Sequence, residues 1–166
     1  LMYGMSGYGL ARELGVSQKD AQAYIDDYFR KHEGVRAFMD GIIEDARERG
    51  YVRTFSGRIR RIPELASPDS ALRQFGERVA MNTPVQGTAA DIIKMAMITI
   101  ASRMKRENLR SRLIMQIHDE LVCEVEREER EVMENVVREE MENVVHLSVP
   151  LKVSMGTGEN WALSHE

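Results

Sequence analysis

The sequence lacks any long hydrophobic run. A membrane-spanning helix needs roughly 18 to 20 uninterrupted apolar residues, and no stretch of the 166 residues comes near this length. The first residues, LMYGMSGYG, also lack the basic and then apolar pattern of a secretory signal peptide. We therefore expect no membrane association and a soluble protein of the cytoplasm.

Cysteine is almost absent, and so are repeats, low-complexity segments and obvious linkers. Cys123 is the only cysteine, so it cannot form an internal disulfide, which agrees with a reducing compartment. It lies in an apolar run and is most simply interpreted as a small buried hydrophobic residue. With 43% hydrophobic residues, the chain can bury one core, which predicts a single domain or a lobe with an appendage.

An excess of positive charge is absent as well. The net charge of -4 argues against a simple basic nucleic-acid-binding module. The charge is nevertheless segregated, since residues 47–78 hold eight arginines and four acids, whereas residues 124–142 hold nine acids and three arginines. The first region could face a polyanion, but an ordinary charged surface explains this pattern equally well.

Hydrophobic periodicity predicts three helices in the first 50 residues. Residues 6–14 form a short helix that ends at Gly15, and Ser17 with Asp20 caps the next one. The apolar stripe of that second helix is predicted to be a core face and not a stacking platform; it comprises Ala21, Tyr24, Ile25, Tyr28 and Phe29. A third helix follows Gly34 and stops at Gly50.

After Gly50 the hydrophobic pattern changes from the spacing of helices to that of short strands. Residues 51–55 and 58–62 are predicted to be the strands of an arginine-rich hairpin, with Ser56 and Gly57 at its turn. Helices are expected from Pro68 to Asn82 and from Val85 to about Glu107, with a kink or a restart at Pro84. Strands at 113–117 and 121–125, an acidic helix at 128–145 and a last strand at 150–155 complete the order. This succession predicts an α+β fold.

The stretch LIMQIHDELVCEV (113–125) places His118, Asp119 and Glu120 among apolar residues. Burial of two unpaired carboxylates would cost several kcal/mol, and on a straight strand neighbouring side chains point to opposite faces. We therefore expect these three residues to form the tip of a hairpin, where both acids approach the same space. The flanking side chains predicted to anchor the hairpin are Leu113, Met115, Ile117 and Leu121.

Carboxylates held close together are suitable ligands for Mg²⁺, which prefers one or two of them with waters and substrate phosphates. Such a site suits phosphoryl or nucleotidyl transfer. The alternative is an ordinary acidic surface turn, with His118 a hydrogen-bonded surface or core group.

Arg78, Asn82 and Gln86 follow one another at intervals of four residues. On a helix this spacing places them along one face at intervals of roughly 6 Å. All three are hydrogen-bond donors, and the minor groove presents an acceptor on each strand at every base pair, so such a row can probe pairing without reading sequence. We expect the row and the acidic turn to line the same channel. The alternative is polar residues that cap and solvate a helix, above all at Asn82.

Five motifs together resemble the C-terminal part of the bacterial family A DNA polymerases. They cover almost the whole chain in the family's order and comprise YGMSGYGLARELG (3–15), GYVRTFSGRIRRIP (50–63), NTPVQGTAADIIKMAM (82–97), QIHDELV (116–122) and GTGENW (156–161). The resemblance implies that residues 1–72 complete a helical fingers part. It implies that residues 73–166 belong to a palm part, whose small antiparallel sheet carries the acidic hairpin.

The resemblance also implies roles for single residues. Asp119 would bind catalytic Mg²⁺, with Glu120 as its less directly coordinated catalytic neighbour and His118 near the primer terminus. Arg78, Asn82 and Gln86 would contact the minor groove of primer-template DNA. Tyr3 and Gly4 would lie near the incoming nucleotide and the template. The arginine hairpin would lie near the DNA backbone.

The implied partners are primer-template DNA, deoxynucleoside triphosphates and the N-terminal remainder of a polymerase, which would supply a second metal-binding aspartate. We therefore expect the isolated segment to be inactive, to bind duplex DNA weakly, and to self-associate through exposed edges. Two alternatives stay open. One is a non-catalytic duplex-binding or assembly fragment, and the other is a metal-dependent hydrolase that uses His118, Asp119 and Glu120.

Overall fold

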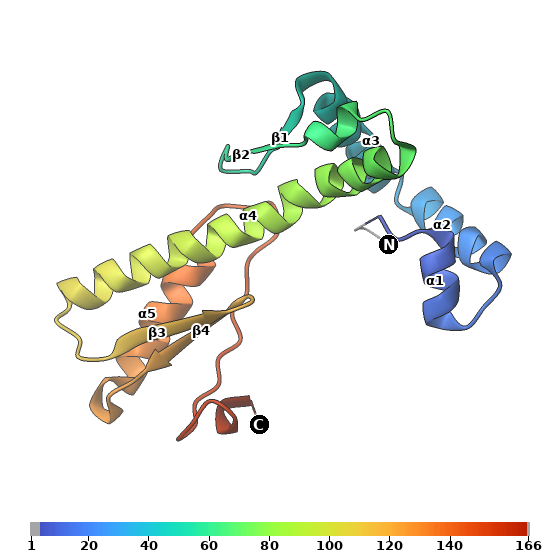
Figure 1. The fold of residues 1–166 in the computed structure, drawn as a ribbon. Coiled ribbons are helices and arrows are strands. Elements are labelled where there is room, and N and C mark those ends of the chain that lie inside the picture. Colours follow the sequence, from blue (N-terminus) through green and yellow to red (C-terminus); the bar gives the residue numbers. More distant parts are fainter. Residues whose placement is uncertain (1–3, 166) are drawn as a thin grey trace. The chain divides into compact units, whose positions relative to one another are not determined.

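The computed structural model describes residues 4–165, which form two compact units. Unit 1 comprises residues 1–88 and unit 2 comprises residues 89–166, with the long helix α4 (Ser70–Arg106) contributing to both. The α+β class is confirmed, because helices dominate and two small antiparallel sheets accompany them (Figure 1). No helix between residues 4 and 165 is long and apolar enough to cross a membrane.

Unit 1 begins with three helices, α1 (Gly7–Leu14), α2 (Gln18–Lys31) and α3 (Glu33–Arg49). The predicted caps are confirmed. Ser17 accepts a hydrogen bond from the backbone of Asp20 at 3.1 Å, and Gly15 and Gly50 end α1 and α3 in the left-handed conformation, which glycine adopts without steric cost.

The predicted arginine-rich hairpin is also confirmed, although its strands are shorter than expected. Strand β1 (Tyr51–Arg53) pairs with β2 (Ile59–Arg61), and a short 3-10 helix, η1 (Pro63–Ala66), leads into α4. Ala46, Val52, Ile62 and Ala80 form the buried core that joins α3, this hairpin and α4.

The stripe of α2 is only partly a core face. Ala21 and Ile25 are buried, whereas Tyr24 is 54% exposed, so the prediction that its aromatic rings are core residues is wrong for Tyr24. The apolar contact of α2 is narrower than its run of hydrophobic residues.

Helix α4 runs without a break through Pro84, so the predicted alternative of a helix restart at this proline is wrong. The helix begins where Asp69 accepts hydrogen bonds from the backbone of Ala71 at 2.8 Å and of Leu72 at 3.4 Å. Proline removes one backbone donor from a helix, but side-chain hydroxyls add bonds on either side of it. Thr83 donates to the carbonyl of Val79 at 2.7 Å, and Thr88 donates to that of Pro84.

Unit 2 packs the rest of α4 against a hairpin and a helix. The hairpin comprises β3 (Arg112–Ile117) and β4 (Glu120–Glu124), and the 3-10 helix η2 (Arg127–Glu129) leads into α5 (Arg130–Glu142). The core of this unit comprises Ile100, Met104, Met133 and Val136, and Leu121 and Cys123 pack against it. Cys123 is thus a small hydrophobic residue at the core, as the sequence predicted, but it is half-buried and not fully buried. This burial raises the pKa of its thiol.

The predicted last strand at 150–155 is wrong, because this segment has no regular secondary structure. A strand needs a partner for its backbone groups, and β3 and β4 pair only with each other among the described residues. The segment is instead fixed by single contacts, such as the bond from the backbone of Val153 to Glu142 at 3.0 Å. A last 3-10 helix, η3, covers Leu163–His165.

Candidate functional site

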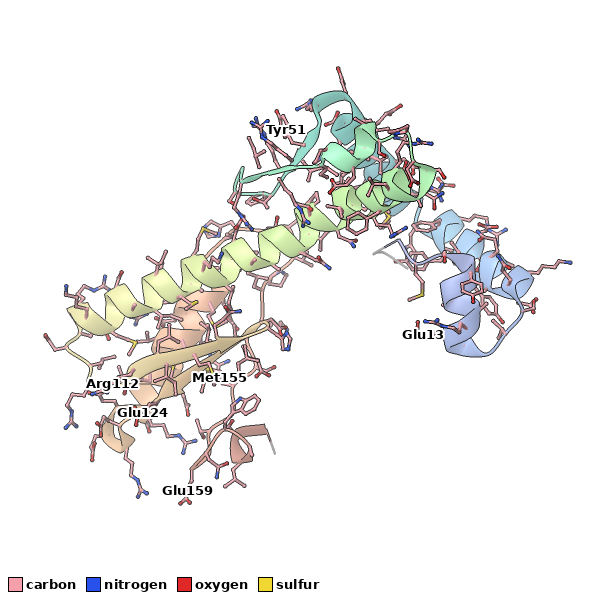
Figure 2. All side chains as sticks on the ribbon, viewed as in Figure 1. Glu13, Tyr51, Arg112, Glu124, Met155 and Glu159 are labelled. Carbon is pink, nitrogen blue, oxygen red and sulfur yellow. The ribbon has the colours of Figure 1, made fainter. Side chains whose placement is uncertain are left out.

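The acidic turn is tighter than predicted. Ile117 and Glu120 form the last pair of the β3–β4 ladder, so the turn consists of His118 and Asp119 alone, and the predicted three-residue tip is wrong because Glu120 already belongs to β4. Arg112 and Glu124 pair at the opposite end of the hairpin (Figure 2).

The turn depends on an uncommon backbone conformation at His118, whose φ is 53°. Few residues other than glycine adopt a positive φ, although histidine is among the more frequent exceptions. A positive φ at the first of two turn residues is typical of a type II′ turn, which matches the twist of the flanking strands. The side chain of Gln116 also donates to the carbonyl of His118.

The anchoring of the hairpin follows the prediction except at one residue. Leu113, Ile117 and Leu121 are half-buried, whereas Met115 is 44% exposed. The cause is a register shift between Leu113 and Met115. A bulge adds one residue to a strand and so reverses the alternation of side chains beyond it. Met115 and Ile117 therefore both lie on the face opposite Leu113, paired with Val122 and Glu120, and Ile117 is half-buried on that face.

Asp119 is exposed at the turn and forms no ion pair or side-chain hydrogen bond with any residue between 4 and 165. Glu120 is also exposed but does have an interaction within the chain. The two acids therefore differ, and Asp119 is the carboxylate that is available to an external cation.

The donor set at the turn fits a share in a Mg²⁺ site. Mg²⁺ binds one or two protein carboxylates and takes its other ligands from water and phosphates, so Asp119 could be one of these ligands. Within the part of the chain that the structure describes, no three His, Cys, Asp or Glu side chains are placed to hold a metal together. The hydrolase alternative, which needs further ligands around residues 118–120, gains no support.

Arg78, Asn82 and Gln86 all lie on α4, as the spacing predicted. Arg78 and Gln86 are exposed and Asn82 is half-buried. The helix is continuous at Asn82, so this residue caps no helix end, and the capping alternative is wrong. Its side-chain oxygen is buried without a hydrogen-bond partner in the described structure.

Gly4 lies directly against this row. A Cβ atom at Gly4 would be 3.2 Å from Cγ of Arg78 and 2.7 Å from Cε of Met81, and the φ of Gly4 is 76°. A side chain here would therefore meet both contact and backbone strain. The structure thus brings Gly4 and Arg78 into contact. Tyr3 lies outside the described residues.

Hydrogen bonds fasten the turn of the arginine hairpin to α4 immediately after Gln86. The sequence did not predict this contact. The backbone of Phe55 donates to Oγ1 of Thr88 at 2.9 Å, and Nη2 of Arg58 donates to the carbonyl of Gly87 at 3.1 Å. A Cβ atom at Gly87 would be only 2.6 Å from the methyl carbon of Thr54. The signal in the sequence was a glycine inside a helical pattern, which often marks a close approach of another segment.

The start of β3 is held by a carboxylate. Glu129 accepts hydrogen bonds from the backbone of Arg110 and of Ser111, each at 2.9 Å, and from the hydroxyl of Ser111 at 2.6 Å. These donors, with that of Arg110 the largest contributor, lower the pKa of Glu129.

A cluster of ion pairs links α4 to α5. Arg103 contacts Glu107, Glu139 and Glu140 at 2.6 to 3.3 Å. These acids raise the pKa of the Arg103 guanidinium, and the hydrogen bond that Arg103 donates to Glu107 contributes most. The hairpin that carries Asp119 therefore packs, through Leu121 and Cys123, against two helices that are themselves joined by several charge-assisted hydrogen bonds.

The helix row lies in unit 1 and the acidic turn in unit 2, and the structure describes each by itself. Arg78, Asn82 and Gln86 lie on a helix and His118 and Asp119 lie at the hairpin turn, as the sequence predicted, whereas Glu120 is a strand residue.

Comparison with known proteins gives one consistent result. The family model of DNA polymerase family A matches residues 1–163. DNA polymerase I of Bacillus subtilis is 48% identical over 161 residues, and that of Pseudomonas aeruginosa is 45% identical over 165 residues. These matches cover 97% and 99% of the chain, but the chain spans only 18% of the length of either relative.

A solved structure matches as well. The POL domain of Pol1 from M. smegmatis, in complex with DNA primer-template and dNTP, superposes with a TM-score of 0.96 at 44% identity. The match covers 99% of this chain and 29% of the solved one. With the family model matching nearly every residue, the chain belongs to DNA polymerase family A.

Proposed function

We propose that this chain is a segment of a DNA-directed DNA polymerase that adds deoxynucleotides to a primer 3′ end during DNA replication and repair. The observation that carries the proposal is Asp119, which has no partner between residues 4 and 165 and lies at a two-residue turn, in a chain that family A matches over residues 1–163. The solved relative, described in complex with DNA primer-template and dNTP, supports the same two partners for this protein.

In this proposal Asp119 is the metal-binding carboxylate of the segment and Glu120 is its catalytic neighbour. The stiff β3–β4 hairpin fixes where the Asp119 carboxylate is presented. Mg²⁺, when bound, stabilises the charge on the attacking and leaving oxygens of an in-line displacement. One carboxylate does not complete a two-metal site, so the rest of the polymerase supplies the second aspartate.

The other site residues hold the DNA. Arg78, Asn82 and Gln86 donate hydrogen bonds to acceptors in the minor groove of the primer-template duplex, and His118 lies near the primer terminus. Because these acceptors occur at every base pair, the row senses correct pairing without selecting a sequence.

The N-terminal residues serve the incoming nucleotide. Tyr3 and Gly4 lie near the nucleotide and the templating base, and the packing of Gly4 against Arg78 links the nucleotide site to the DNA row. Residues 1–72 complete the fingers and residues 73–166 belong to the palm. This assignment of subdomains differs from the compact units, whose boundary falls at Thr88. The proposed location is the cytoplasm.

A second candidate function is that of a non-catalytic duplex-binding or assembly fragment. The observation in its favour is that the described residues place only one available carboxylate at the turn, in a chain that spans 18% of its relatives. Self-association through the edges of the two-stranded sheets would be a property of such a fragment.

A chain exchange separates the two functions. We define a chimeric polymerase in which the present chain replaces the matching segment of DNA polymerase I from B. subtilis, to which it is 48% identical. We expect the chimeric polymerase to extend a primer, and the isolated chain to show no extension and only weak duplex binding that falls with salt. A chimera that folds and binds primer-template DNA without extending it would favour the non-catalytic function, and robust extension by the isolated chain would contradict our proposal.

A further inference from the structure

The outer face of the β1–β2 hairpin carries two arginines, Arg53 and Arg61, that no acid of the described chain neutralises. In the register of this hairpin Tyr51 lies opposite Arg61, and Arg53 lies opposite Ile59. Opposite residues, and residues two apart on one strand, share a face, so these four side chains form one surface. We call it the outer hairpin face, and Figure 2 marks it by Tyr51.

On the opposite face of the hairpin Val52 is buried, whereas its partner across the ladder, Arg60, is exposed. Val52 is 6% exposed and packs with Ala46 and Ile62. The outer hairpin face points away from this cluster, and its Ile59 is 51% exposed. Phe55, at the turn, is 69% exposed. These exposed apolar side chains lie on the same hairpin as the arginines.

The arginines of this hairpin differ from those of the preceding helices. On α2 and α3, Arg30, Arg36 and Arg49 each pair with a carboxylate of their own helix, as with Asp40 at 2.9 Å from Arg36. By contrast, Arg53 and Arg61 form no ion pair with any residue between 4 and 165. Arg53 instead lies over the ring of Tyr51, 5.4 Å from its centroid, and donates to its hydroxyl at 3.2 Å.

We propose that the outer hairpin face binds single-stranded DNA, with Arg53 and Arg61 on phosphates and the exposed rings and Ile59 beside the bases. In the proposed polymerase this strand is the unpaired part of the template, so the inference rests on the proposed function and adds a contact to it. A cationic surface interleaved with aromatic groups is the usual platform for single strands. A duplex, whose bases are already stacked, would leave the apolar groups without a partner.

The hairpin is also held firmly enough to serve as a platform. Its turn is bound to α4 through Phe55 and Thr88, and Thr54 fills the space above Gly87. Oγ1 of Thr54 in turn accepts a hydrogen bond from the backbone of Arg58 at 3.1 Å. This fastening places the exposed ring of Phe55 at a fixed point next to the DNA row, because Thr88 follows Gln86 by two residues on the same helix.

The test measures binding of the chimeric polymerase to two primer-templates that share one duplex. One has a 5′ template overhang of about 2 nucleotides and the other of about 15, which spans a usual single-strand site. For Arg53→Ala with Arg61→Ala we expect about a tenfold higher Kd on the long overhang and a change within about twofold on the short one. The slope of log affinity against log salt should fall by about 1.4 on the long overhang.

Two matched variants control this experiment. Arg30→Ala with Arg36→Ala removes the same number of guanidinium groups from ion pairs, and we expect it to leave both affinities unchanged. Arg53→Lys with Arg61→Lys keeps the charge and should retain most of the affinity for the long overhang.

Three results would overturn the inference: an unchanged affinity for the long overhang, an equal loss on both overhangs, or a loss that the lysine variant shares in full. Primer extension on the short overhang reads out the proposed function separately. If the unsubstituted chimera fails to extend that primer, the proposed function fails, whatever the overhang data show.

Discussion

At the scale of single residues, the site depends on two that hold unusual positions. His118 adopts a positive φ that most side chains avoid, and Asp119 stays exposed without a partner among the described residues. The first makes the reversal of the chain tight, and the second leaves a carboxylate available for a cation. The presence of a turn could be predicted from the cost of burying two acids. Its two-residue length could not, because it is set by the backbone pairing of Glu120 with Ile117.

A pH-dependent test belongs to Glu129, whose pKa is lowered by bonds from Arg110 and Ser111. A carboxyl with a lowered folded-state pKa stabilises the fold fully above its ordinary pKa of about 4.5, and loses this contribution as the pH falls through the lowered value. We expect Glu129→Gln in the chimeric polymerase to reduce the hydrogen-exchange protection of the Arg110 and Ser111 amides at pH 7. The difference from the unsubstituted protein should shrink below pH 4.5.

Protection factors of a peptide that covers residues 108–114 measure this effect, since they correct for the intrinsic pH dependence of exchange. A difference that is absent at pH 7, or that grows as the pH falls, would show that the carboxylate does not hold the start of β3.

At the scale of elements, the fastening of the hairpin turn to α4 is the feature that a sequence shows least. Its parts are separated by about thirty residues, as with Phe55 and Thr88. Local patterns predicted both the hairpin and the helix. They could not show that Gly87 is the point where the two approach, because that contact is a tertiary one.

Replacement of Gly87 tests this fastening. The new methyl group of Gly87→Ala would meet the buried methyl group of Thr54 at 2.6 Å, and Thr54 cannot rotate away without breaking its bond to the backbone of Arg58. Overpacking of this kind costs about 1 to 3 kcal/mol. We expect the amide of Phe55 to exchange at least about fivefold faster in the variant, by mass spectrometry of a peptide that covers the hairpin.

A second substitution makes the test specific. Thr54→Ser removes the methyl group and keeps the hydroxyl, so Gly87→Ala with Thr54→Ser should regain most of the protection of Phe55. Thr54→Ser alone serves as the control. If the double variant exchanges as fast as Gly87→Ala alone, then contact with Thr54 is not the reason that glycine is needed.

Elsewhere, the elements whose ends are set by local chemistry were predicted correctly, and the elements that depend on a partner strand were not. The helix ends at Gly15 and Gly50 were predictable, because each needs a left-handed residue. The strand at 150–155 was not, since a strand exists only if another pairs with it. Met115 was placed on the wrong face, because a bulge in the chain is invisible in hydrophobic alternation.

At the scale of the whole molecule, the chain consists of two units with separate cores, one around Ile62 and one around Ile100. The resemblance of five motifs in one order correctly predicted the family, which no single motif or charge count could have done. The catalytic and DNA-binding roles that we propose for single residues rest on that family and on the elements that carry these residues. The chain spans 18% of the length of its relatives.

The most direct measurement is single-turnover primer extension by the chimeric polymerase with Asp119→Asn, alongside its Kd for primer-template DNA. The substitution keeps the size of the side chain and removes its negative charge. Our account predicts that extension slows on the order of 10³-fold, while the Kd changes by no more than about threefold, because the proposed minor-groove contacts lie on α4 and not on Asp119. Extension at the unsubstituted rate would contradict the claim that Asp119 is the metal-binding carboxylate of this segment.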